Sequence, residues 1–266
     1  MNFVRHYLLA LQFFTRIPVT GRLAAWVGYS PDMLRASAAH LPGVGWLVGL
    51  LAALGFALMR MLLPDVPGAA LVAALASTAL TVMLTGALHE DGLADVADGL
   101  GGAQERARAL EIMKDSRIGA FGVLALVLAL LLKVALLVML DSLDPWLACA
   151  GLLAAHVGSR FFPLLLIGLL PYVGDAERSK SRPLAGAISL GQLLAAGLWL
   201  LLALALVQAA FDDLLWLWPL LGAGLAWAWM WRLFARRLQG FTGDCLGATQ
   251  QVCELAFYLG LVLAGA

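Results

Sequence analysis

Long runs of apolar residues, separated by short polar segments, form the main pattern along this chain. A membrane-spanning helix needs about 20 predominantly apolar residues. The polar segments between the runs carry prolines, glycines and most of the charges. The pattern predicts an all-α, polytopic membrane helix bundle with about seven transmembrane helices, at residues 41–63, 69–88, 118–140, 146–170, 184–210, 214–235 and 246–265.

The N-terminal region has a different pattern, since Arg5, His6 and Arg16 interrupt its apolar positions. This arrangement predicts an amphipathic helix at the membrane interface, and it does not fit a cleaved signal peptide. No linker or shift in composition marks a second domain. We therefore expect residues 1–266 to form a single integral-membrane domain.

Composition supports the membrane assignment. Of the 266 residues, 62% are hydrophobic and 13% are charged, whereas soluble domains carry about 25% charged residues. The formal net charge is zero, so there is no basic field to attract a nucleic acid.

Basic residues alternate with the predicted crossings and set the expected orientation. Fourteen lie in the segments on one side, and only Arg60 lies in a segment on the other. Cytoplasmic loops are enriched in Lys and Arg. The alternation predicts a protein of the inner (cytoplasmic) membrane with its N-terminus inside and its C-terminus outside.

Two cations fall inside predicted spans, where each costs about 2.5–3.5 kcal/mol on insertion scales. Lys133 could reach the interface or a lipid-shielded partner, or it could belong to a ligand or proton pathway. Arg160 follows His156 by one turn on the same face, which indicates an inward-facing polar site.

Carboxylates gather after the second predicted span, in the stretch HEDGLADVADGLGG (residues 89–102). Asp91, Asp95 and Asp98 are spaced i, i+4 and i+7, so they share one face of a helix continuing from that span. Neighbouring charges about 6 Å apart repel by about 2–3 kcal/mol at an effective dielectric constant near 20. A divalent cation that prefers oxygen ligands, Mg²⁺ or Mn²⁺, would relieve this repulsion.

Further charged residues are expected on the same side of the membrane. Asp115 precedes the third span, with Lys114 and Arg117 beside it, and Asp244 begins the seventh. Carboxylates mixed with cations suit a phosphate ester held through a divalent metal. The alternative is a solvated acidic loop, against which the helical spacing and the shared side argue.

The acidic stretch resembles the signature motif of the cobalamin synthase family, the adenosylcobinamide-GDP ribazoletransferases. The resemblance continues in the same order through LEIMKDSRIGAFGVLAL (110–126) and TGDCLGA (242–248). FFTRIPV (13–19) and LPGVGWLVGL (41–50) are also similar to the family's N-terminal region. The likeness spans almost the whole chain.

This resemblance implies a Mg²⁺-dependent transferase in a late step of cobalamin biosynthesis. Such enzymes join α-ribazole, or its 5′-phosphate, to adenosylcobinamide-GDP in the membrane and release GMP. The product is adenosylcobalamin or its 5′-phosphate. The sequence leaves open whether the chain forms a homo-oligomer.

The resemblance also assigns expected roles to residues. Catalysis would fall to Asp91, Asp95, Asp98 and Asp115, and the metal would be held by these four together with Asp244. Substrate contacts would come from His89, Arg16, Lys114, Arg117 and Glu254. His89 could instead cap its helix. Some relatives carry a glutamate where this chain has Gln251, which leaves Glu254 as the next carboxylate.

Two other functions compete with this one. A CDP-alcohol phosphotransferase also uses membrane-edge aspartates, and DVADG (95–99) partly matches its pattern, but Gln104 and Gly119 depart from it. A transporter would need ionisable groups at the midplane and usually a repeat. Here the acids cluster at one face and the sequence shows no repeat.

Overall fold

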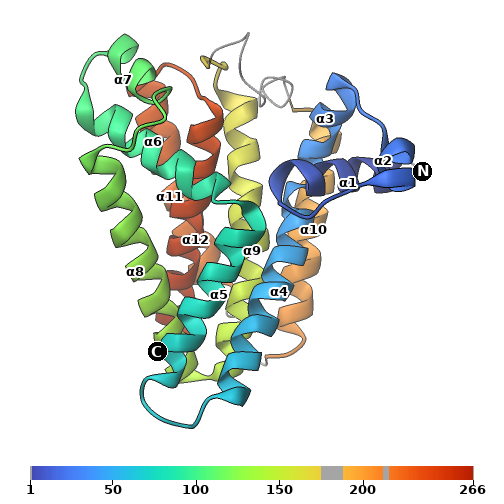
Figure 1. Cartoon of the computed structure of the whole chain (residues 1–266), viewed down its shortest axis with the longest axis vertical. Helices are drawn as coiled ribbons and strands as arrows, with labels where there is room; N and C mark the ends of the chain where they lie inside the picture. The colour runs from blue at the N-terminus through green and yellow to red at the C-terminus, as the bar shows by residue number, and fades with distance from the viewer. Residues whose placement is uncertain (1, 175–187, 212–215, 266) are drawn as a thin grey trace.

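The long helices of this protein stand side by side as a bundle (Figure 1). A computed structural model describes residues 2–174, 188–211 and 216–265. Regular structure in these residues is helical apart from one bridge between Tyr172 and Phe241, which confirms the all-α expectation. The long helices are α4 (Leu41–Leu62), α5 (Ala69–Thr85), α8 (Ala120–Leu143), α9 (Pro145–Leu169), α10 (Leu190–Gln208), α11 (Leu217–Arg237) and α12 (Gly243–Gly265).

Shorter helices gather at one end of the bundle, which we call the short-helix end (Figure 1). The N-terminus lies near this end and the C-terminus lies near the other. The amphipathic N-terminal helix that the sequence predicts is α1 at this end. The short-helix end is formed by α1 (Asn2–Phe14), α2 (Gly21–Val27), α3 (Pro31–Ser37), η1 (Ala38–His40), α6 (Leu88–Gly102) and α7 (Arg106–Ile112).

The predicted count of seven spans is not confirmed. Within the described residues, five helical stretches are long and apolar enough to cross a membrane, or six if the bent pair of α5 and α6 counts as one span. The five are the stretch Pro31–Leu62 and helices α8, α9, α10 and α12. Helix α11 is long enough, but its tryptophans and Arg232 lower its mean hydropathy.

Parts of the sequence prediction lie outside the described residues. Two predicted spans begin there, with residues 184–187 of one and 214–215 of the other. Three of the basic residues used to predict orientation also lie there, Arg178, Lys180 and Arg182.

Helix α8 shows how the bundle faces its surroundings. Leu124, Leu128 and Leu131 are about 60% exposed along its outer face, whereas Lys133 is buried on its inner face. An apolar exterior around a polar interior is expected of a protein whose solvent is lipid. The chain is therefore a multi-pass membrane protein.

The chain turns sharply between α5 and α6, and this corrects one sequence expectation. Gly86 and Ala87 both have left-handed backbone conformations, with φ of 66° and 59°. The two helices consequently meet at 89°. The prediction that the acidic helix simply continues the second span is wrong. A left-handed alanine costs about 1–2 kcal/mol, which the packing around the bend has to offset.

Helices α4 and α9 approach closely through a pair of glycines in α4. A Cβ atom on Gly45 would overlap the carbonyl oxygen of His156, and one on Gly49 would lie 2.9 Å from the Cα of Leu153. Small residues four apart let two membrane helices pack backbone to backbone. This contact fixes α9, which carries Arg160 and part of the cavity described below.

We expect Gly45→Ala to destabilise the protein by about 1–3 kcal/mol, because the added methyl group overpacks a rigid contact. Thermal unfolding in detergent measures the effect. The matched control is Gly224→Ala in α11, where an added Cβ meets nothing within 4 Å. Replacing that helical glycine should leave stability unchanged or raise it. Equal losses in both variants would contradict this account of the contact.

Candidate functional site

A cavity of about 720 Å³ opens at the short-helix end, between α1, α6, α9 and α12. This volume lies in the range of small-molecule sites, about 300–1,000 Å³. One part of the wall is apolar, with Phe14, Leu41, Leu164 and Ile167. The polar part includes Arg16, His89, Asp91, Asp244 and Gln250.

The two wall aspartates come together because α6 crosses the start of α12 at a glycine. A Cβ on Gly92 would lie 2.8 Å from the carbonyl oxygen of Asp244, so no larger residue fits there without a shift. Asp91 precedes this glycine and is exposed to the cavity. Asp244 accepts a hydrogen bond from the Thr242 hydroxyl at 3.1 Å, which orients its carboxylate.

A backbone hydrogen bond to the last turn of α5 holds Arg16 at the cavity. The backbone N–H of Arg16 donates to the carbonyl oxygen of Leu84 at 2.6 Å. At the C-terminus of α1, the Thr15 hydroxyl donates to the carbonyl oxygen of Leu11 at 2.7 Å. A side chain on Gly86 would overlap the guanidinium group of Arg16, so glycine serves both the turn and this close approach.

The three aspartates of α6 share a face, as predicted, but their surroundings differ. Asp91 is exposed, Asp95 is half-buried and Asp98 is buried. Asp98 accepts hydrogen bonds from the backbone N–H groups of Gly119 at 2.7 Å and Gly122 at 2.8 Å. A carboxylate at the N-terminus of α8 accepts from backbone N–H groups that have no partner within the helix. Its negative charge also interacts favourably with the positive end of the helix dipole. Asp98 thus joins α6 to α8.

Asp115, Lys114 and Arg117 do not line the cavity. The Asp115 carboxylate accepts hydrogen bonds from the Arg117 guanidinium at 2.6, 3.0 and 3.1 Å, and from the Arg117 backbone N–H at 3.1 Å. These hydrogen bonds lower the pKa of Asp115 to about 2. Asp115 is therefore ionised and already paired, and Lys114 lies exposed beside it.

The five predicted metal ligands do not form one shell. In the described part of the chain, no three His, Cys, Asp or Glu side chains are arranged to hold a metal ion. Asp91 and Asp244 remain available on the cavity wall, and Asp95 lies within electrostatic range of both. Mg²⁺ commonly uses one or two carboxylates together with substrate phosphates and water. Two wall carboxylates fit that mode of binding.

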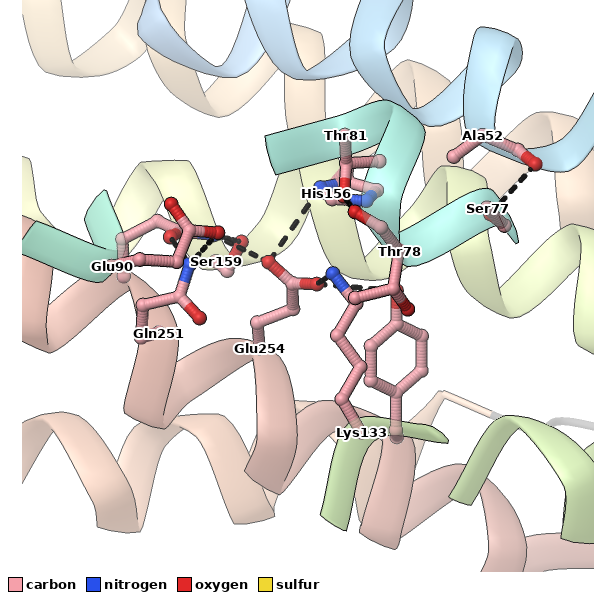
Figure 2. Close-up of polar contacts among 12 residues, drawn as sticks. Ala52, Ser77, Thr78, Thr81, Glu90, Lys133, His156, Ser159, Gln251 and Glu254 are labelled. Atoms are coloured by element: carbon pink, nitrogen blue, oxygen red, sulfur yellow. Dashed lines mark hydrogen bonds and ion pairs between the residues drawn. The ribbon is translucent and has the colours of Figure 1, made fainter. Parts of the chain in front are cut away.

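Glu254, a predicted substrate contact, does not line the cavity. It lies inside the bundle, one turn farther along α12 than the wall residue Gln250. It is 1% exposed, and its carboxylate pairs with the Lys133 ammonium at 2.6 Å (Figure 2). Lys133 therefore has a partner inside the bundle. His89, in contrast, lines the cavity as predicted.

Arg160 faces inward, as its spacing from His156 indicates. It is 1% exposed, and its guanidinium donates to the His156 carbonyl oxygen at 2.9 Å. Gln251 does not line the cavity, and its amide donates to Glu90 at 3.2 Å and to Gln250 at 3.0 Å. Glu90 is accordingly buried, off the face that carries Asp91.

Comparison of the sequence with known proteins places the chain in a family. Residues 6–262 match the family model described as cobalamin-5-phosphate synthase. The chain belongs to this family. No solved structure matches it.

Close relatives in the cobalamin-5-phosphate synthase family carry the name adenosylcobinamide-GDP ribazoletransferase. The protein of Polaromonas sp. (strain JS666) is 62% identical over 99% of this chain and 98% of its own length. That of Albidiferax ferrireducens is 62% identical over 98% and 99%. That of Polaromonas naphthalenivorans is 59% identical over 99% of both chains.

Sequence reasoning missed several wall residues of this family member. Gln250 had a usable signal, because it is polar within an apolar span and lies one turn before Glu254 on the same face. Phe14, Leu164 and Ile167 had none, since apolar residues in apolar helices do not reveal which of them face a cavity.

We expect Asp98→Ala to lower the free energy of unfolding by about 1–3 kcal/mol, because it leaves buried N–H groups of α8 without an acceptor. Asp98→Asn, which keeps one acceptor oxygen, should lose less. The control is Asp95→Ala, which removes a crowded carboxylate that accepts no hydrogen bond among the described residues. Unfolding temperatures equal to the parent's in Asp98→Ala would show that the carboxylate does not hold α8.

We expect the Asp115 carboxylate to stay ionised as the pH falls below 3.9, the ordinary pKa of aspartate, and to take up its proton near pH 2. NMR of the labelled carboxyl carbon follows this titration. Arg117→Met removes the hydrogen-bond donors, so its Asp115 should titrate near the ordinary value. An unchanged titration in that variant would rule out Arg117 as the cause.

Proposed function

We propose that this chain transfers α-ribazole, or its 5′-phosphate, to adenosylcobinamide-GDP and releases GMP. The proposal is carried by one observation: a family member places two carboxylates and an arginine on the wall of one nucleotide-sized cavity. Relatives that are about 60% identical over nearly the whole chain carry the name of this activity.

The reaction exchanges the phosphoanhydride bond of the donor's pyrophosphate for a new phosphoester bond. A ribose hydroxyl oxygen of the acceptor attacks the phosphorus that carries the cobinamide. The bond from that phosphorus to the bridging oxygen of the pyrophosphate breaks, and GMP leaves with this oxygen. The hydroxyl proton passes to a cavity carboxylate or to water. Because the hydroxyl attacks, an acceptor with a 5′-phosphate keeps it in the product.

The polar wall suits the phosphate part of the donor. Arg16 presents a guanidinium group, which binds phosphate oxygens in a bidentate manner. Asp91 and Asp244 face the same space, from which a phosphate would be repelled without a cation. The apolar wall with Phe14 and Leu164 suits a heteroaromatic base.

Asp91 and Asp244 would hold Mg²⁺ together with phosphate oxygens of the substrate, and Asp95 would support them from the same face of α6. When bound, the ion would neutralise charge on the bridging and leaving oxygens. Asp98 and Asp115 have structural partners in the protein, so we assign them to positioning the α6–α8 segment.

We also propose that the protein lies in the inner membrane with this cavity on the cytoplasmic side. The count of basic residues in the short segments supports this orientation. All three wall charges named above lie at the short-helix end, with the N-terminus. The proposed site therefore opens to the compartment that contains nucleotides.

We expect purified protein in detergent with Mg²⁺ to convert adenosylcobinamide-GDP and α-ribazole into adenosylcobalamin and GMP. Chromatography of corrinoids and nucleotides measures both products. Turnover in detergent distinguishes an enzyme from a transporter, which needs a sealed vesicle. Turnover of a CDP-linked alcohol donor in place of adenosylcobinamide-GDP would support the phosphotransferase alternative.

In the same assay, Asp91→Asn and Asp244→Asn should each lower kcat by at least about 100-fold, as expected when charge stabilisation of the transition state is lost. Both proteins should still insert into the membrane. The matched control is Asp65→Asn, since Asp65 is fully exposed between α4 and α5, away from the cavity. Wild-type turnover in either wall variant removes that residue from the proposed site.

A further inference from the structure

Glu254 is the centre of a polar network inside the bundle. Its carboxylate accepts from the Lys133 ammonium at 2.6 Å, from the Gln250 amide at 2.6 Å and from the Tyr258 hydroxyl at 3.4 Å. His156 faces it from α9 at 3.6 Å. Figure 2 shows Lys133 and His156 approaching the carboxylate from different helices.

Stability alone does not account for the ion pair of this network. Lys133 and Glu254 are both at least 95% buried, and removing two charges from water costs several kcal/mol for each ion. Replacing a buried ion pair with apolar residues is often neutral or stabilising. In some proteins, buried ionic groups are retained because they specify one conformation of their surroundings.

The group that this pair orients is Gln250. A carboxylate can only accept hydrogen bonds, so the amide nitrogen of Gln250 must face Glu254. The same nitrogen also donates to the Ser159 hydroxyl at 2.9 Å, which uses both of its hydrogens. Its amide oxygen accepts from the Gln251 side chain at 3.0 Å. The amide is thus held in one orientation from three sides.

Gln250 also belongs to the cavity wall, one turn from Gly247 and Leu246. Gln250 thus links the buried network to the cavity, although it is only 1% exposed. Its amide oxygen has two lone pairs, and the contact from Gln251 leaves one of them for a donor group of a ligand. We infer that Lys133 and Glu254 are positioning residues that fix Gln250 as a polar contact for the nucleotide part of the substrate. The nature of that ligand rests on the proposed function, whereas the positioning of Gln250 does not.

The test removes both charges of the pair together. A single substitution would leave an unpaired buried charge and disrupt folding. The test variant is Lys133→Met/Glu254→Gln. The matched control is Arg60→Met/Asp141→Asn, which removes an ion pair of 3.0 Å between α4 and α8 at the end away from the cavity.

The first measurement is independent of activity. In ¹⁵N-labelled protein, the Gln250 side-chain amide, assigned by its absence in Gln250→Met, should give two separate and slowly exchanging proton signals. The control variant and the conservative Lys133→Arg should retain them. Rotation about the amide C–N bond is slow even in a mobile side chain, so the two signals should not merge. In the test variant they should instead exchange faster with solvent and shift towards the values of an exposed glutamine. If it fails to fold, Glu254→Asp, which keeps the charge but shortens the side chain, replaces it.

The second measurement is kinetic. The test variant should raise KM for adenosylcobinamide-GDP about tenfold, the size expected for one weakened hydrogen bond, with kcat within about twofold. Gln250→Met should give the same change, and combining all three substitutions should add nothing further, because they act through one contact. The control variant should keep the parent KM.

Two results would overturn the inference: unchanged amide signals in the test variant, or a KM that stays at the parent value while only the unfolding temperature falls. Absence of turnover in the parent protein would refute the proposed function, and the amide signals would still decide the positioning of Gln250.

Discussion

The outer faces of the long helices are largely apolar, so a charged side chain inside the bundle needs a partner there. Glu254 shows what this constraint produces. Lys133 reaches it from α8, His156 faces it from α9, and Gln250 contacts it from its own helix. These contacts join the three helices α8, α9 and α12. They also connect the bundle interior to the cavity, because Gln250 belongs to both.

Close backbone contacts then decide which charges reach the cavity. Helix α6 crosses α12 at Gly92, and this crossing puts Asp91 beside Asp244. Farther along α6, the carboxylate of Asp98 holds the start of α8, and a Cβ on Gly122 of α8 would overlap it. Of the aspartates on this helical face, Asp91 thus faces the cavity and Asp98 is satisfied by backbone N–H groups.

The sequence by itself determined the broad architecture. Apolar runs of membrane length fixed most of the long helices to within a few residues, because burying or facing lipid requires that composition over that length. The spacing of Asp91 and Asp98 placed them on one face of a helix. The motifs in their order indicated the family, which the matching of residues 6–262 confirmed.

Only the tertiary structure decided which of these residues share a site. The left-handed pair Gly86 and Ala87 turns α6 out of line with α5, and a hydrophobic pattern does not register a single turn of this kind. Lys133 and Glu254 are more than 100 residues apart, so their pairing follows from helix packing and not from local spacing. Residue type identified the charges, whereas the packing of α6, α9 and α12 determined which of them face the cavity and which are neutralised beneath it.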